Sequence, residues 1–150
     1  MTDLLVIGYG NDLRSDDGAG RAVAEMVSDL DLPGVEVRTV SQLTPELTLE
    51  IAGRRMVVFV DADVDATEVA VRPVTAGPPD DGPMTHHGDP ATLLSLTENV
   101  GPLPERALVV SIPATNLEMG FTFSPRTVRA IGEAVDLIAA MAQDVRAEKP

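Results

Sequence analysis

The sequence predicts an α/β fold in which one mixed, mostly parallel β-sheet lies between two layers of helices. Strand-like and helix-like segments alternate along the 150 residues, which is typical of parallel strands joined by crossover helices. Two of the strand-like segments, Leu4–Ile7 and Met56–Val60, are continuous apolar runs of the kind that is buried on both faces of a sheet. The length favours a single domain over residues 1–150.

The expected elements are bounded by turn residues, helix caps and changes of hydrophobic period. In chain order they are strands at Leu4–Tyr9, Val35–Val40, Met56–Val60, Glu68–Val74 and Ala107–Ile112, with helices at Gly18–Leu30, from Thr44-Pro45 to Gly53, from Asp89-Pro90 and from Ser124-Pro125. The segment Glu68–Val74 alternates, and we expect a tight return that pairs it with the strand before it.

Helical spacing also predicts which side chains face the core. In the first helix the periodic apolar residues are Ala19, Val23, Met26, Val27 and Leu30. In the later helices they are Leu47 and Ile51, then Leu93, Leu94 and Leu96, and finally Val128, Ile131, Val135 and Ile138. Residues 75–88 are rich in proline and glycine and predict a long loop, which in a small domain is usually functional or disordered.

The composition excludes several classes of function. Aromatic residues are only 3% of the chain, so the core must be aliphatic. The lack of cysteine excludes disulfides, thiolate metal sites and a cysteine nucleophile. A net charge of −13 disfavours nucleic acid and anionic membranes as partners. No apolar run is long enough to span a bilayer and no basic segment precedes Asp3, so we expect a cytoplasmic protein.

The most informative segment follows the first strand, at the edge where open α/β proteins form their sites. Gly8 and Gly10 match the start of a dinucleotide-binding pattern, but Leu13 stands where its third glycine belongs. Asp16 and Asp17 would repel a phosphate at a helix N-terminus. The segment therefore predicts either a cation site or a helix cap, and one aspartate would suffice for the cap.

Two further polar groups lie at strand ends or in loops. Asp61 directly follows the run Val57–Val60, where a carboxylate is costly unless it is exposed or paired. His86 and His87, the only histidines, end the proline-rich loop. Two carboxylates and one imidazole with open coordination positions would make a divalent-metal site. The alternative interpretation of Asp61 is an aspartate in a turn, and that of the histidines is a surface position without function.

Asp61 and Asp63 also resemble the D-x-D signature of haloacid-dehalogenase-type phosphatases. Those enzymes need a lysine partner, and the only lysine here is Lys149. An EF-hand loop starting at Asp61 would need glycine and glutamate where Ala66 and Arg72 stand. A serine hydrolase is also disfavoured, because the chain has no G-x-S-x-G motif.

Taken in order, the motifs resemble those of the hydrogenase maturation endopeptidase family. The resemblance rests on G-Y-G-N-D-L-R-S-D-D-G-A-G at 8–20, Q-L-T-P-E-L at 42–47, V-D-A at 60–62 and T-H-H-G-D-P-x-x-L-L at 85–94. It implies a three-layer α/β/α sandwich with a five-stranded sheet, one strand of which is antiparallel. It also implies an endopeptidase that removes the C-terminal extension from a nickel-loaded precursor of a nickel–iron hydrogenase large subunit.

Carried over residue by residue, the family's catalytic and metal-contacting positions fall on Asp17, Asp61 and His86. The resemblance favours Asp17 over Asp16, whose expected role is helix capping, and His86 over His87. It further implies that the nickel arrives with the substrate and that no organic cofactor is used. Two other functions stay open: a magnesium-dependent phosphoryl-transfer enzyme using Asp61 and Asp63, and a non-catalytic metal-binding maturation chaperone. The sequence leaves the oligomeric state open.

Overall fold

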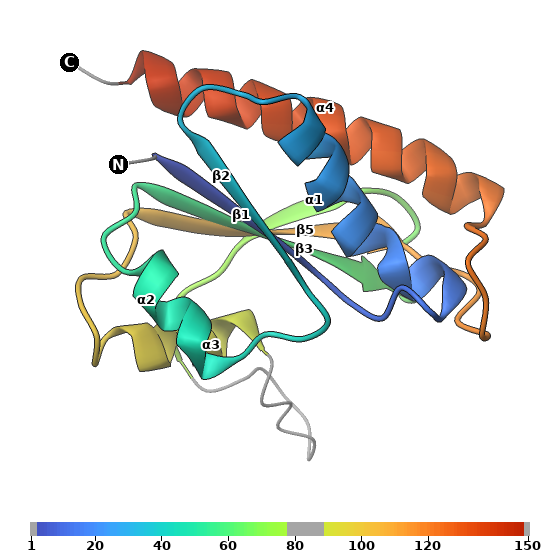
Figure 1. Cartoon of the computed structure of the whole chain (residues 1–150), viewed down its shortest axis with the longest axis horizontal. Coiled ribbons are helices and arrows are strands. Elements are labelled where there is room, and N and C mark those ends of the chain that lie inside the picture. Colours follow the sequence, from blue (N-terminus) through green and yellow to red (C-terminus); the bar gives the residue numbers. More distant parts are fainter. Residues whose placement is uncertain (1–2, 78–88, 149–150) are drawn as a thin grey trace.

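The computed structural model describes residues 3–77 and 89–148 of the chain. These residues form a five-stranded sheet with helices on both faces (Figure 1). The strands are β1 (Leu4–Tyr9), β2 (Val35–Val40), β3 (Met56–Asp63), β4 (Ala70–Pro73) and β5 (Arg106–Pro113). The helices are α1 (Ala19–Asp29), α2 (Thr48–Ile51), α3 (Pro90–Thr97) and α4 (Pro125–Ala147), with short 3-10 helices η1 (Ser15–Gly18) and η2 (Pro45–Leu47) preceding α1 and α2.

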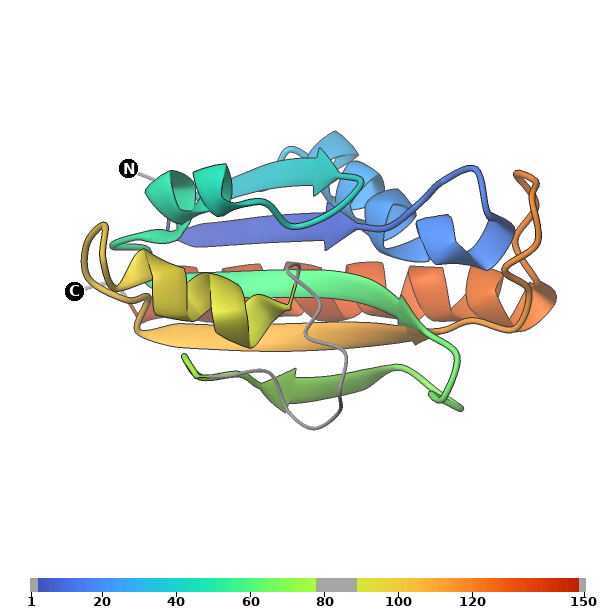
Figure 2. The same cartoon turned by 90° about the horizontal axis from the view of Figure 1, so that it is seen from below.

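The sheet has the order β2-β1-β3-β5-β4. The first four strands in this order run parallel and β4 runs antiparallel to β5, so the sheet is mixed and mostly parallel, as the sequence predicts. Helices α1 and α4 cover one face, and α2 and α3 cover the other (Figure 2). The expected three-layer α/β/α class is confirmed.

Two apolar cores result from the alternation of side chains along each strand. Leu4 and Val6 of β1 pack toward α1 and α4, whereas Leu5 and Ile7 pack toward α2 and α3. The side chains of β3 alternate between the two cores in the same way. Its Phe59 is fully buried in the core beneath α2 and α3. The central strands are apolar on both faces because each face is covered by helices.

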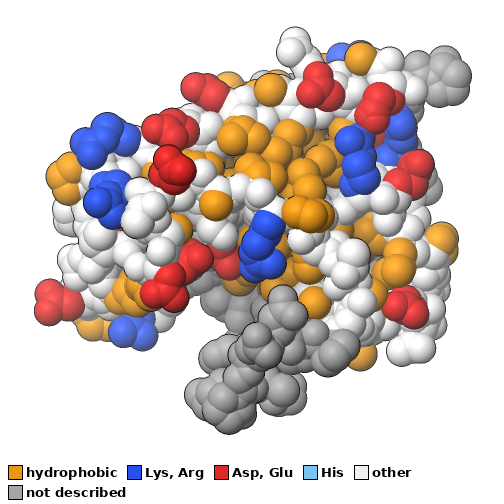
Figure 3. All heavy atoms as spheres, turned by 180° about the vertical axis from the view of Figure 1, so that it is seen from behind, with side chains coloured by type: hydrophobic (Ala, Val, Ile, Leu, Met, Phe, Trp, Pro, Cys, Tyr) orange, Lys and Arg blue, Asp and Glu red, His pale blue; other side chains and the backbone are white. Residues whose placement is uncertain are grey.

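The pairing predicted for the fourth strand is wrong. β4 does not return beside β3, because both edges of β3 are already occupied by β1 and β5. It pairs instead with the outer edge of β5, with Val71 opposite Val110. Seen from the β4 side, hydrophobic side chains are visible between this edge strand and α4 (Figure 3).

Two further sequence expectations need correction. Strand β3 does not end at Val60 but continues to Asp63, because β5 extends beside it and pairs with these last residues. Val128 is more than half exposed, and the neighbouring Thr127 takes the inward position at the start of α4, where its hydroxyl donates to the carbonyl of Pro113. Met26, Leu30 and Leu96 are also exposed. The other core positions expected on the helices are buried.

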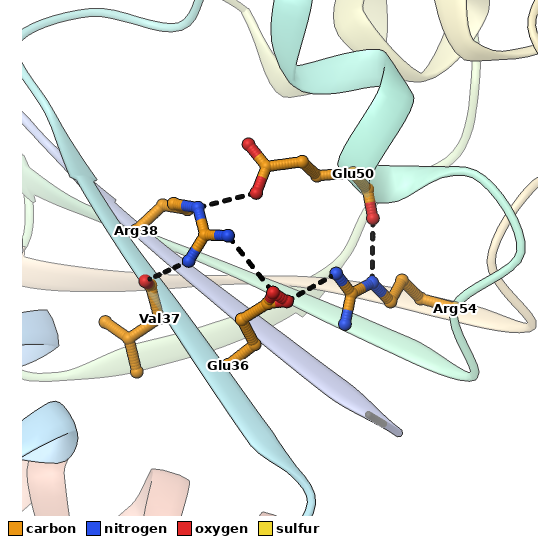
Figure 4. A network of polar contacts seen from close by, with 5 residues as sticks. All are labelled: Glu36, Val37, Arg38, Glu50 and Arg54. Carbon is orange, nitrogen blue, oxygen red and sulfur yellow. Dashed lines mark hydrogen bonds and ion pairs between the residues drawn. The ribbon is translucent and has the colours of Figure 1, made fainter. Parts of the chain in front are cut away.

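An ion-pair network attaches α2 to the edge strand β2 (Figure 4). Glu36 of β2 receives hydrogen bonds from Arg54 at 2.8 Å and from Arg38 at 3.1 Å. Arg38 also pairs with Glu50, and the Nε of Arg54 donates to the main-chain carbonyl of Glu50. The hydrogen bond from Arg54, opposed by burial, holds the pKa of Glu36 below its usual value. The network holds a helix of only four residues in place.

Candidate functional site

The loop between β1 and α1 lies tightly against the ends of two parallel strands, because two positions carry no side chain. Gly10 has a φ of 140°, and a Cβ there would collide with the main-chain carbonyl of Asp17. A Cβ on Gly20 would collide with the carbonyls of Val60 and Tyr9. The glycines therefore let η1 and the start of α1 lie at the carboxyl ends of β1 and β3.

Asp17 lies in η1 and is half-buried. Its Oδ2 accepts a hydrogen bond of 2.8 Å from the main-chain N–H of Asn11, and the Asn11 side chain in turn accepts one from Leu13. Asp17 does not cap a helix N-terminus. Its Oδ1 accepts no hydrogen bond from the described part of the chain, so one oxygen remains available to a ligand.

Asp16 is fully buried, and its expected role as a helix cap is wrong. Its carboxylate accepts hydrogen bonds from three main-chain N–H groups, those of Thr115, Asn116 and Ser124, at 2.7 to 2.9 Å. The hydroxyls of Ser124 and Thr115 donate to the same carboxylate. Asp16 therefore ties η1 to the loop after β5 and to the residue before α4.

This environment determines the charge state of Asp16. Burial alone would raise the pKa of the carboxyl, but the hydrogen bonds from Ser124, Asn116 and Thr115 outweigh it and lower the pKa well below its usual value. Asp16 therefore stays ionised with all of its donors in place. It is a structural tether for the loop that carries Asp17, a role that sequence reasoning missed because its partners lie about 100 positions away.

Asp61 lies beside Tyr9, because β1 and β3 pair with Gly8 opposite Val60 and each chain then continues by one residue. The Tyr9 hydroxyl donates to Oδ2 of Asp61 at 3.0 Å. The other oxygen, Oδ1, is buried and has no hydrogen-bond partner among the described residues. Tyr9 was not identified as a site residue from the sequence, although its position at the end of a parallel strand is a usable signal.

The protonation of this pair is displaced from the ordinary range. Burial raises the pKa of Asp61 and the nearby charge of Asp63 adds to the effect, while the hydrogen bond from the Tyr9 hydroxyl opposes it. Burial and the Asp61 charge both raise the pKa of Tyr9, so the phenol remains protonated and serves as a donor. Asp61 is a poorly solvated carboxylate at the carboxyl end of a central strand. Binding a cation or a proton would stabilise such a group.

The remaining candidate residues do not add a ligand to Asp17 and Asp61 within the described part of the chain. Oδ1 of Asp63 accepts a hydrogen bond from the main-chain N–H of Asp65, so this carboxylate is engaged in the turn after β3. His86 and His87 lie outside the described residues, and so does Lys149. Asp89 caps α3 as expected, with its carboxylate accepting from Ala91.

The structure thus brings Asp17 and Asp61 to the same end of the sheet, where the parallel strands β1 and β3 finish. Within residues 3–77 and 89–148, no three histidine, aspartate or glutamate side chains form a group that could hold a metal ion. A three-ligand site would therefore need a residue such as His86, outside the described ranges. No helix in the described part of the chain is long and apolar enough to cross a membrane.

Comparison with known proteins shows which solved structures share the fold of this chain. No family model matches the sequence, and no curated protein matches it. The hydrogenase maturating endopeptidase HybD from E. coli superposes with a TM-score of 0.77 at 20% identity, over 96% of this chain and 93% of that one. The hydrogenase maturation protease HycI from Thermococcus kodakarensis gives 0.75 at 22% identity, over 95% and 93% of the two chains.

The chain has the fold of the hydrogenase maturation endopeptidases. A hydrogenase 2 maturation peptidase from a Thaumarchaeota archaeon has the same fold, with a TM-score of 0.68 and 23% identity over 93% of this chain and 97% of that one. The likeness covers nearly the whole length of each protein. It confirms the fold that the sequence motifs imply.

Proposed function

We propose that the chain is a maturation endopeptidase that cleaves the C-terminal extension from a nickel-loaded hydrogenase large-subunit precursor. The fold shared with proteins of that name and the motif at residues 8–20 support the proposal. The observation that carries it furthest is Asp61, which has one oxygen held by Tyr9 and a second, buried oxygen without a partner in the described part of the chain. A buried oxygen of this kind is well suited to bind a metal ion presented by a substrate.

In the proposed mechanism Asp17, Asp61 and His86 read whether the precursor carries nickel. Asp61 is oriented by Tyr9, and Asp17 is held by the Asn11 main chain with one oxygen left over. Because the chain has no cysteine, hydrolysis would use water rather than a thiolate nucleophile. Either the metal would activate that water by lowering its pKa, or a carboxylate would accept its proton. Nickel is cargo of the substrate in this proposal, and the reaction takes place in the cytoplasm.

The proposal is tested by incubating the protein with nickel-loaded and nickel-free large-subunit precursor and recording intact masses. We expect loss of a C-terminal fragment only from the nickel-loaded form, and only with wild-type protein or a control variant. Asp61→Asn should abolish cleavage, whereas Asp63→Asn, two residues along the same strand, should retain it. A phosphoryl-transfer enzyme would release no C-terminal fragment, and its activity would need Asp63 but not His86, although the Asp63 carboxylate is engaged in a turn. Nickel transfer to the protein without any change in precursor mass would favour a chaperone.

A further inference from the structure

Three large hydrophobic side chains protrude at the end of the molecule where Asp17 lies. The exposed fractions are 79% for Phe121, 76% for Met119 and 48% for Leu13. Leu13 belongs to the loop after β1 and the other two to the loop after β5, and Figures 1 and 2 show these loops side by side. We call this set the Leu13–Met119–Phe121 patch. Single exposed apolar residues are common on proteins, but three on adjoining loops need an explanation.

The two loops are joined through their main chains. The N–H of Gly120 donates to the carbonyl of Leu13 at 2.8 Å, and the N–H of Ser15 donates to the carbonyl of Gly120 at 2.8 Å. Since Gly120 lies between Met119 and Phe121, these bonds fix the backbone that carries both exposed side chains beside Leu13. The patch therefore has a defined position relative to the candidate site.

Side-chain contacts hold the second loop further. The Ser15 hydroxyl donates to the carbonyl of Glu118 at 2.8 Å, and Arg14 donates to the carbonyl of Leu117 at 3.1 Å. The buried carboxylate of Asp16 holds the start of the loop and Ser124 at its end. Fixing a loop before binding lowers the entropy lost on association. Phenylalanine and methionine are also enriched in the cores of protein interfaces.

The charges around the patch indicate the chemistry of a partner. Carboxylates lie on the same two loops: Asp12 and Glu118, which directly precede Leu13 and Met119, are exposed, and Asp17 is half-buried. Of the nearby cations, Arg21 is 3.8 Å from Asp12 and Arg14 is engaged with Leu117. The chain as a whole carries −13. A complementary surface would offer an apolar recess with a basic margin, and its approach would be steered by this net charge.

We infer that the Leu13–Met119–Phe121 patch is the docking surface for the protein substrate. The inference rests on the proposed function and adds the surface by which the precursor is recognised. A folded precursor bound here lies next to η1, so that its C-terminal segment can reach Asp17 and Asp61. In this arrangement the patch recognises the precursor protein, and the candidate site recognises the metal that the precursor carries.

The test uses the double variant Met119→Ser/Phe121→Ser in the full chain. Both side chains are exposed, so the melting temperature should stay at the wild-type value. The control is Leu49→Ser: Leu49 is 74% exposed on α2, at the other end of the molecule (Figure 1). Binding of nickel-loaded precursor is measured by surface plasmon resonance and cleavage by intact mass. We expect Kd and KM of the double variant to rise roughly tenfold or more, with kcat within about twofold of wild type.

Unchanged Kd and KM in the double variant, or an equal rise in Leu49→Ser, would overturn the docking inference. A lower kcat with unchanged KM would also overturn it, because the patch would then act on chemistry rather than on binding. Wild-type protein that binds the precursor through the patch without cutting it would refute the proposed function and leave the docking surface standing. If light scattering shows a wild-type dimer that the double variant loses, the patch is an interface between two copies of this chain.

Discussion

Replacing Asp16 with alanine should strongly destabilise the protein. The substitution removes the acceptor for three main-chain N–H groups and two hydroxyls. Each buried N–H left without a partner costs about 1–3 kcal/mol. Water can reach part of the vacated space, so we expect a loss of about 3–5 kcal/mol in the free energy of unfolding. Asp16→Asn keeps the side-chain shape but turns an N–H₂ group toward the main-chain donors. It should lower the free energy of unfolding by about 2 kcal/mol.

The assay is urea unfolding followed by circular dichroism, with the slope m compared between variants. The matched control is Asp12→Ala, four residues earlier in the same loop, whose exposed carboxylate forms an ion pair with Arg21 at 3.8 Å. Its loss should be within about 0.5 kcal/mol. If Asp16→Ala costs less than about 1 kcal/mol with an unchanged m, the tether is not a stabilising contact and the reasoning is refuted.

The same tether predicts a pH dependence. Because the pKa of Asp16 is lower in the folded than in the unfolded chain, its contribution is complete above the ordinary aspartate pKa of about 3.9. The contribution is lost as the pH falls below that value. The difference in unfolding free energy between wild type and Asp16→Asn should therefore be constant from about pH 5 to 7 and shrink by pH 3. A difference that grows on acidification would contradict the assigned charge state.

The remaining predictions concern the site and the α2 network. Asp61→Asn should leave the free energy of unfolding at pH 7 unchanged or raise it by up to about 1 kcal/mol, because burial disfavours the charged carboxylate that it removes; a large drop in melting temperature would mark Asp61 as structural. His86→Ala should abolish Ni²⁺ binding measured by calorimetry and His87→Ala should preserve it, with wild-type affinity falling as the pH drops through about 6.5; the reverse order would shift the assignment by one residue. Glu36→Gln should lower the free energy of unfolding, measured by thermal unfolding, by no more than about 1 kcal/mol, because its partly exposed ion pairs are screened. A loss several times larger would show that the network behaves as a buried one.

Local patterns were sufficient for most of the fold. The apolar runs of β1 and β3 identify central parallel strands, and Asp89-Pro90 identifies the start of α3. These features depend on neighbours in the sequence, so periodicity and capping chemistry report them directly. Val128 was misplaced because Thr127 competes for the same inward position, and a buried hydrogen bond to Pro113 decides between them.

Features that depend on distant pairing were not accessible in this way. The alternation of residues 68–74 predicts a strand but contains no information on which edge it joins, and the occupied edges of β3 exclude the nearer choice. Asp16 and Asp17 are adjacent identical residues in the sequence, but Asp16 is buried among donors from residues 115–124, whereas Asp17 is half-buried and accepts from the main chain of Asn11. Asp61 could be identified from its position after an apolar run, whereas its partner Tyr9 follows from register alone.

The span of the Asp16 tether has a consequence for biosynthesis. The donors to Asp16 lie 99, 100 and 108 residues downstream of it, so the loop that carries Asp17 is translated long before its anchors exist. Contacts of such large sequence separation form late, and a nascent chain folds as its segments emerge. On the ribosome the loop stays unanchored until β5 and the residue before α4 have appeared. A nascent chain that still lacks residues 115–124 therefore cannot hold this loop in its ordered form.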